Sequence, residues 1–238
     1  MIIENFNIKL RRIQESDLEL IRSWRNSTFV RQHMEFREEI TPEMQLQWFH
    51  KINNENNLYL FIESQNEKVG LINLKGINFK RKSTEIGIYM ADEKYVSTRL
   101  PLLALMTIAE AGLHFFGLEK LHAHVLKSNN RSIHLTKTCG FKLCKKQENV
   151  ENQRYEVTKS DIEIKFIPII KALRKIYGED RFSRILFEPH DFTSGYAVRM
   201  IRRLNPDIQI YRSFDKDGVC FSGISPYTNS RIKVDSVI

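Results

Sequence analysis

Residues Val96–Pro101, with the sequence VSTRLP, lie where a charged turn meets a long apolar segment, and the start of such a helix can hold a phosphate group. Phosphate-binding helix starts usually contain glycines, which let backbone amides approach the anion, and this stretch contains none. Thr98 can cap the helix, Arg99 offers a guanidinium suited to phosphate, and Pro101 lacks an amide hydrogen. Two interpretations stay open: a site in which a side-chain charge replaces an amide, or an ordinary helix start.

Two histidines could bind a metal, because His122 and His124 are two residues apart on an expected strand and therefore share a face. A metal pair would need a third ligand, and none is evident in the sequence. We favour histidines on a sheet face beneath a helix. The three cysteines cannot all pair and include no CxxC motif, so we expect neither a disulfide framework nor a zinc site.

The bulk composition is that of a globular protein, with 42% apolar and 28% charged residues in a chain of 238. The net charge of +8 suits anionic partners, but the basic residues are dispersed, which does not favour nucleic-acid binding. The richest apolar run, Leu100–Phe116, contains Glu110 and His114, and the first residues lack the apolar core of a signal peptide. We therefore expect a cytoplasmic protein that does not associate with membranes.

Apolar periodicity and turn residues predict the elements that hold these groups. The expected helices begin near Ser16 and at Thr41–Pro42, with Met44, Trp48 and Ile52 on the apolar face of the second. Further along the chain we expect a meander of three strands at 58–64, 68–79 and 83–90, and then a buried helix at 100–116. A strand at 119–127, a short helix at 129–140 that ends at Gly140, and a hairpin at 141–159 follow.

The pattern changes after Thr158, where a helix interrupted by Pro168 is expected, followed by a strand, a helix and two strands at 184–188, 194–205, 207–214 and 219–225. We predict an α+β architecture with two units. Residues 1–160 would form one domain around a mixed, mostly antiparallel central sheet flanked by helices. Residues 161–238 would form a small α/β domain of unknown role.

The order of these elements resembles the GNAT acyltransferase fold over residues 7–160. The segment NNRSIHLTKTCGFK, residues 129–142, is similar to a motif of the branch that contains the ribosomal-protein N-terminal acetyltransferases. The segments LIRSWRNSTFVRQHM and ITPEMQLQWFHKI resemble the nucleotide-linked amino-sugar N-acetyltransferases. At the pyrophosphate loop the chain departs from the family pattern, because Arg99 and Pro101 occupy the two glycine positions.

The resemblance implies acetyl-CoA as co-substrate and a set of site residues. Glu85 would take the proton of the attacking amine, although a surface carboxylate is the competing interpretation. Thr136 stands where many relatives have a tyrosine general acid, and His134 or Tyr89 could replace it. The implied acetyl-CoA contacts are Ile88, Tyr89, Met90, Ser97, Thr98, Arg99, Leu100, Asn129 and Ser132. The implied substrate contacts are Trp24, Arg25 and Asn26.

The activity implied by the resemblance is acetyl transfer to a primary amine by direct attack on the thioester. The favoured acceptor is a nucleotide-linked amino sugar of surface-polysaccharide synthesis, and a homodimer is an assembly that the resemblance leaves open. Two alternatives remain. One is a protein N-terminal acetyltransferase, and the other is a degenerate GNAT module that binds a partner without catalysis, which VSTRLP and Thr136 favour.

Overall fold

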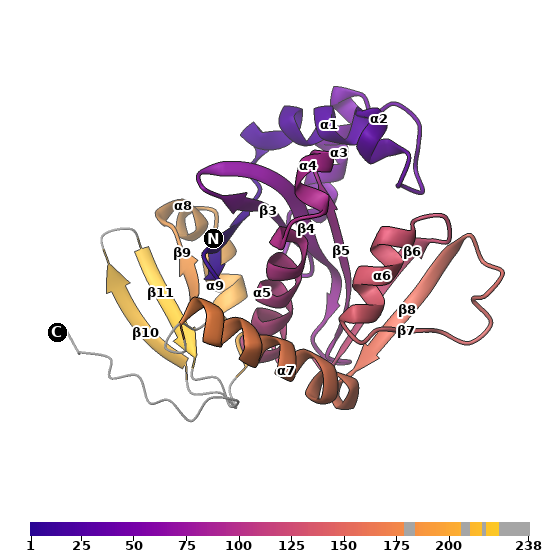
Figure 1. Ribbon diagram of the computed structural model, residues 1–238. Coiled ribbons are helices and arrows are strands. Elements are labelled where there is room, and N and C mark those ends of the chain that lie inside the picture. The colour runs from indigo at the N-terminus through magenta and orange to yellow at the C-terminus, as the bar shows by residue number, and fades with distance from the viewer. Residues whose placement is uncertain (179–183, 206–209, 216–217, 224–238) are drawn as a thin grey trace.

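The computed structural model describes residues 1–178, 184–205, 210–215 and 218–223. Their strands are β1 (Ile2–Asn5), β2 (Ile8–Arg12), β3 (Leu58–Ser64), β4 (Glu67–Asn78), β5 (Ser83–Met90), β6 (Lys120–Leu126), β7 (Lys142–Leu143), β8 (Asn152–Thr158), β9 (Arg184–Phe187), β10 (Ile210–Asp215) and β11 (Gly218–Gly223). Within the described residues they form one sheet in the order β10-β11-β9-β1-β2-β3-β4-β5-β6-β8-β7 (Figure 1). Of the neighbouring pairs, β5 and β6 are parallel and the others antiparallel, which confirms the expected α+β class.

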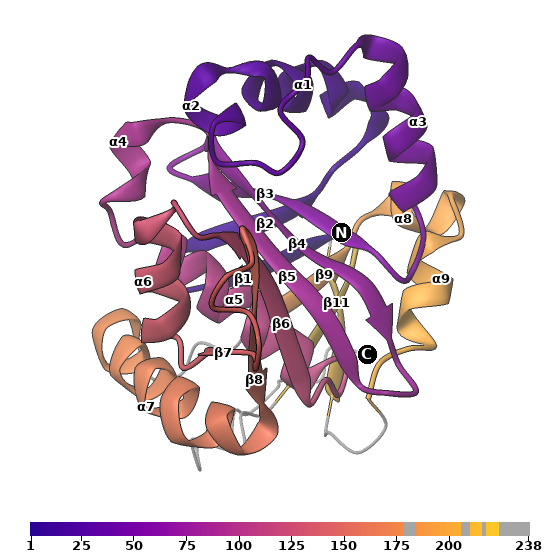
Figure 2. The same ribbon diagram turned by 90° about the vertical axis from the view of Figure 1, so that its right-hand side faces the viewer.

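Helices cover both faces of the sheet. They are α1 (Leu18–Asn26), α2 (Thr28–Arg31), α3 (Pro42–Ile52), α4 (Glu93–Val96), α5 (Leu100–His114), α6 (Asn130–Thr138), α7 (Lys159–Tyr177), α8 (Pro189–Thr193) and α9 (Tyr196–Ile201). Side chains of β3 alternate between two cores, so that Leu58, Leu60 and Ile62 pack with α5, while Tyr59 and Phe61 pack with α1 and α3. Figure 2 shows α1, α2 and α3 lying together along one side of the molecule. None of the described helices is both long and apolar enough to cross a lipid bilayer.

Helix α5 is buried on nearly all sides, as its composition predicted. Its polar stripe is buried as well. Glu110 accepts a hydrogen bond from Arg174 of α7 and another from Asn5 Nδ2 of β1, at 2.5 Å, and His114 Nε2 lies 4.0 Å from Glu110 Oε1. This group, which we call the Glu110 cluster (Asn5, Glu110, His114 and Arg174), links the C-terminal segment to the core.

The C-terminal elements extend the same sheet. Strand β9 pairs with β1, with Ile3 opposite Ile185, and β11 pairs with the other edge of β9. Backbone pairing therefore joins residues beyond 160 to the first strand of the chain. The proposed division into domains 1–160 and 161–238 stays a prediction.

Several expectations about individual elements need correction. Pro168 does not interrupt α7, which is continuous. The proline leaves the carbonyl of Ile164 without its usual helical donor, but Ile164 is 67% exposed and water can serve that group. On α3 the buried positions are Gln45 and Phe49, whereas Met44 is 38% exposed. Strand β1 and helix α8 were not predicted, because both are too short to show a period.

The first helix also begins differently from the sequence prediction. Ser16 lies inside a 3-10 turn, Glu15–Asp17, that precedes α1, and the cap is Gln14. The Asp17 carboxylate accepts a hydrogen bond from the Gln14 amide at 2.8 Å and an ion pair from Arg11, which fixes the turn. Thr41 caps α3 as predicted, by accepting from the Met44 amide. Parts of two expected strands, 207–209 and 224–225, lie outside the described residues.

Candidate active site

The main cavity lies where β5 and β6 separate. These strands pair only from Ser83 to Glu85 on β5 and from Lys120 to His122 on β6. Beyond that point β5 continues along β4, and β6 continues along β8. The gap opens into a cavity of about 1180 Å³ lined by residues 85–90 of β5 and 123–126 of β6, with α1, α2 and α6 around it.

The gap exposes two strand edges to a ligand. Along the facing edges of residues 86–90 and 123–126, no strand pairing is recorded among the described residues. Unpaired strand edges present amide and carbonyl groups, and an extended chain that carries amides can bind them as a further strand would. Ile88, Tyr89 and Met90, predicted to contact acetyl-CoA, lie on this edge and line the cavity.

Glu85 stands at the closed end of the gap, surrounded by basic side chains. Its carboxylate oxygens lie 3.4 Å from His124 Nδ1, 3.8 Å from His122 Nε2 and 3.7 Å from Lys75 Nζ. The Glu85 side chain is 24% exposed, and Glu85, His124 and Lys75 all line the cavity. We call these four residues the Glu85 cluster.

Within the Glu85 cluster, the surroundings of His122 favour its neutral imidazole. Burial and then the positive charge of Arg154 lower the pKa of His122, while the Glu85 charge acts in the opposite direction. Burial, followed by the Glu85 charge, raises the pKa of Tyr59 to about 12. A carboxylate next to a neutral imidazole can accept the proton of a substrate ammonium and share it. The histidines do lie on one face of the sheet, as predicted, but their contact with Glu85 was missed, because it depends on the register of β5 against β6.

The glycine-free stretch at the start of α5 offers few free amides. The Leu100 amide donates to Thr98 Oγ1 at 3.2 Å, Pro101 has no amide hydrogen, and the Leu103 amide donates to the Arg99 carbonyl. Ser97 and Thr98 line the cavity, whereas Arg99 and Leu100 lie outside its lining. A phosphate here would depend on the hydroxyl groups and on the exposed Arg99 side chain more than on an amide cradle.

Helix α6 presents the second group of expected contacts. Asn129 caps the helix through Oδ1, which accepts from the Ser132 amide at 3.1 Å, and both residues line the cavity. Asn129 is therefore both the N-cap of α6 and a residue of the cavity lining. Thr136, His134 and Tyr89 all line the cavity, and His134 and Tyr89 stay the candidates for general acid.

The three expected substrate contacts separate in the structure. Arg25 lines the cavity. Trp24 packs edge-on against Phe61 with ring centroids 5.4 Å apart, and Asn26 holds the following loop through two hydrogen bonds of 2.9 Å with the Ile40 backbone. Trp24 and Asn26 lie outside the cavity lining, and their assignment as substrate contacts stays a prediction.

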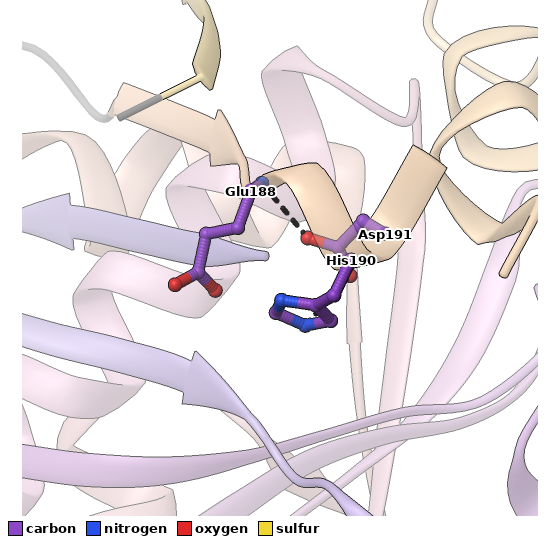
Figure 3. Close-up of side chains that lie close together, drawn as sticks. All are labelled: Glu188, His190 and Asp191. Carbon is purple, nitrogen blue, oxygen red and sulfur yellow. Dashed lines mark hydrogen bonds and ion pairs between the residues drawn. The ribbon is translucent and has the colours of Figure 1, made fainter. Parts of the chain in front are cut away.

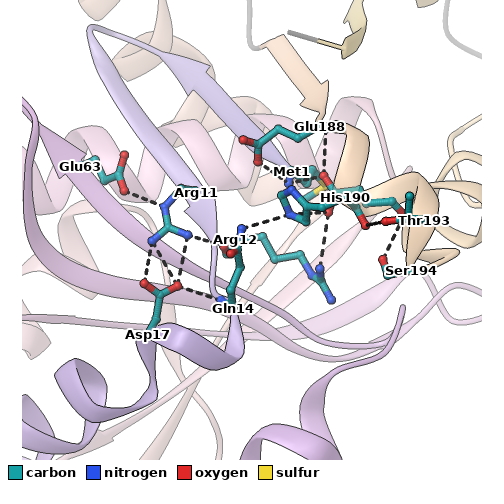
Figure 4. Close-up of polar contacts among 11 residues, drawn as sticks. Met1, Arg11, Arg12, Gln14, Asp17, Glu63, Glu188, His190, Thr193 and Ser194 are labelled. Carbon is teal, nitrogen blue, oxygen red and sulfur yellow. Dashed lines mark hydrogen bonds and ion pairs between the residues drawn. The ribbon is translucent and has the colours of Figure 1, made fainter.

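Apart from the cavity, Glu188, His190 and Asp191 form a cluster of residue types that can bind a metal ion (Figure 3). Their ligand atoms lie within 4.8 Å of one another. Both carboxylates, however, pair with the amino group of Met1, and Arg12 Nη1 lies 3.5 Å from Asp191. Figure 4 shows these contacts continuing through Gln14 toward Arg11 and Asp17. The charges are already compensated, and we assign the cluster to packing α8 against the N-terminal strands.

Comparisons with known proteins agree with this geometry. The family model of the GNAT acetyltransferase domain matches residues 7–142. An uncharacterised protein of Methanocaldococcus jannaschii is 28% identical over 150 residues, which cover 60% of this chain and 30% of that protein. Spermidine N(1)-acetyltransferase of Escherichia coli is 27% identical over 139 residues, 57% of this chain and 73% of that enzyme. This chain thus spans less than a third of the first relative.

Solved structures show the same fold. Spermidine N-acetyltransferase from Vibrio cholerae, in complex with CoA and spermine, superposes with a TM-score of 0.58 at 20% identity, over 68% of this chain and 99% of that one. A ribosomal L7/L12 alpha-N-protein acetyltransferase, in complex with coenzyme A, gives 0.55 at 18% identity, over 66% and 98%. The chain belongs to the GNAT acetyltransferase family, as the sequence resemblance indicated.

Proposed function

We propose that the protein transfers the acetyl group of acetyl-CoA to a primary amine, in the cytoplasm. The observation that carries this proposal is the position of Glu85, with His124 3.4 Å away, at the closed end of the gap between β5 and β6. An acyl-pantetheine arm bound along the strand edges would bring its thioester toward this end. Backbone groups of residues 88–90 would hold the arm, and Ser97, Thr98 and Arg99 with the start of α6 would hold the phosphates.

The proposed reaction is direct attack. Glu85, assisted by His124, accepts one proton from the acceptor ammonium, and the freed nitrogen lone pair attacks the thioester carbonyl carbon. The new C–N bond forms as the C–S bond breaks, and the thiolate leaves with the electron pair of that bond. The amide nitrogen loses its second proton, and the thiolate gains one from water or from a side chain of the cavity.

We favour a nucleotide-linked amino sugar as acceptor, and the charge of the cavity supports this choice. Its lining contains three cationic residues, Arg25, Lys75 and Arg131, against the two carboxylates Glu35 and Glu85. A polyamine carries several positive charges and needs an excess of carboxylates. An acceptor that combines one amine with anionic phosphates fits this balance better.

Spermidine is the second candidate acceptor, because the name of the Escherichia coli relative states that activity. A protein N-terminus is the third, from the resemblance to ribosomal-protein acetyltransferases. These acceptors differ in charge, so a single panel can separate them. The non-catalytic alternative predicts no turnover with any of them.

The test is a release assay for the CoA thiol with acetyl-CoA and three acceptors: a UDP-linked 4-amino-4-deoxy sugar, spermidine, and a peptide with a free N-terminus. We expect turnover with the nucleotide-linked sugar to exceed that with the others by 10-fold or more in kcat/KM. Glu85→Gln controls for uncatalysed transfer. Faster turnover of spermidine would replace the acceptor, and no turnover with any of the three would contradict the proposed function.

A further inference from the structure

Two hydrogen-bond donors that line the cavity have no recorded partner among the described residues. The Tyr89 hydroxyl is buried and has no hydrogen-bond partner among the described residues. No hydrogen bond or ion pair with another described residue is recorded for the Arg25 guanidinium, which is half-buried. Both residues line the cavity. Buried polar groups are normally satisfied, so the unpartnered Tyr89 hydroxyl, in a cavity that also holds the Arg25 guanidinium, indicates a ligand that supplies acceptor atoms.

Arg25 and Tyr89 lie close enough to influence each other. Burial lowers the pKa of Arg25, and the negative charge that Tyr89 or Tyr59 would carry opposes this shift. Burial raises the pKa of Tyr89, and the Arg25 charge lowers it in return. At neutral pH the pair is therefore a guanidinium beside a protonated phenol, and both groups are donors.

Glu85 lies on the same face of β5 as Tyr89, toward the other end of the cavity. Glu85 and Tyr89 are four residues apart on β5 and share a face, with Cα atoms roughly 13 Å apart at the rise of an extended strand. Gly87 lies between them on β5 and has no side chain to occupy the cavity, and Asn73 of β4 lies beside it. The charges of both Glu85 and Arg25 act on the pKa of Tyr59, and all three side chains line the same cavity.

We propose that Arg25 and the Tyr89 hydroxyl bind a phosphoryl group of the acceptor, while Glu85 receives its amine. This assignment rests on the proposed function, names the diphosphate as the group recognised, and moves Tyr89 from the acetyl-CoA side to the acceptor side. A guanidinium can bind two phosphate oxygens at once, and the phenol can donate to a third. Because the Cα atoms of Glu85 and Tyr89 are roughly 13 Å apart, the arrangement suits an acceptor whose amine and phosphate lie on opposite sides of a sugar ring.

The test is calorimetric titration of UDP, and separately of inorganic pyrophosphate, into protein saturated with CoA, so that the CoA phosphate sites are filled. We expect both probes to bind the wild type. Arg25→Gln should weaken them by 10- to 100-fold, as expected for loss of a charge-assisted contact, and Arg25→Lys should recover part of the loss. Tyr89→Phe should weaken them by about 3- to 10-fold.

The control is Arg31→Gln, which removes a cation from α2 outside the cavity lining. It should bind both probes like the wild type, and all four variants should keep the wild-type affinity for CoA and the wild-type melting temperature. The proposal is overturned if the wild type binds neither probe, if Arg25→Gln binds them unchanged, or if CoA affinity falls in parallel. Because the probes carry no amine, their binding is independent of turnover, so failure of this site and failure of the proposed activity give different results.

Discussion

The Glu85 and Glu110 clusters each combine a glutamate with histidine and a cation, yet they differ in enclosure. The Glu110 and Arg174 side chains are both 1% exposed and are joined by a hydrogen bond, and Asn5 adds another at 2.5 Å. Glu85 is 24% exposed, and its three basic neighbours stand 3.4–3.8 Å away, beyond good hydrogen-bonding distance for most of them.

The difference in enclosure separates a structural role from a chemical one. In the Glu110 cluster, partners from β1, α5 and α7 pair with the Glu110 carboxylate and exclude solvent from it. The Glu110 charge therefore serves to hold these three elements together. In the Glu85 cluster, loosely held partners beside a cavity leave the carboxylate able to take a new partner. Similar residue types thus support packing in one place and proton transfer in the other.

The largest effect is expected from breaking the Glu110 cluster. Arg174→Met leaves a buried carboxylate without its cation and should lower the free energy of unfolding by about 3–5 kcal/mol. Lys142→Met is the control, because Lys142 forms an exposed ion pair with Asp161 of the same helix and should change stability by less than ~1 kcal/mol. Urea denaturation measures both. Equal losses would show that the Glu110 cluster does not hold α7.

Glu85→Gln should have the next largest effect, now on rate. Removing the proton acceptor should lower kcat by roughly 10²-fold, while the melting temperature and CoA affinity stay near wild type. His124→Asn should lower kcat less, and the alkaline side of the pH–rate profile should recover part of the loss in both variants as the free amine becomes populated. A profile identical to wild type would remove Glu85 from the mechanism.

Arg99→Ala tests whether a side chain replaces the missing glycine amides at the start of α5. Loss of a charge-assisted contact to the pyrophosphate should weaken CoA binding by roughly 10- to 100-fold, and Arg99→Lys should restore only part. Dephospho-CoA should show the same relative loss, because the 3′-phosphate is not the group held. If both variants bind CoA like the wild type in calorimetry at one salt concentration, VSTRLP is only a helix start.

The smallest expected effect is a decrease in the free energy of unfolding at acid pH. Burial lowers the pKa of His114 below its ordinary value of 6.5; the Glu110 charge opposes this shift and the Arg174 charge adds to it. The unfolded chain therefore binds a proton at this residue more readily, and the free energy of unfolding should fall as pH drops below about 6.5. His114→Gln should reduce this slope between pH 6.5 and 5.5 in urea titrations. An unchanged slope would mean that other groups cause the loss of stability at acid pH.

The two clusters also show what sequence can reveal. The order of elements, the buried α5 and the Thr41 cap followed from periodicity and capping residues, which are local. The contacts of Glu85 with His122 and His124 depend on strand register, and the pairing of Glu110 with Arg174 joins residues 64 positions apart. The Trp24 contact is a related case: helical spacing predicts the face on which Trp24 lies, but only tertiary packing brings that face against Phe61.

The most direct measurement for the central claim is calorimetric titration of acetyl-CoA into the wild-type protein, with the melting temperature followed in parallel. The account predicts one acetyl-CoA per chain and a stabilisation of about 2.7 kcal/mol when acetyl-CoA is present at ~100 times its dissociation constant. Glu85→Gln should bind acetyl-CoA equally well, because the carboxylate acts on the amine and not on the arm. Absence of binding and of any thermal shift at millimolar acetyl-CoA, with no other acyl-CoA binding in its place, would contradict an acetyl-CoA site between β5 and β6.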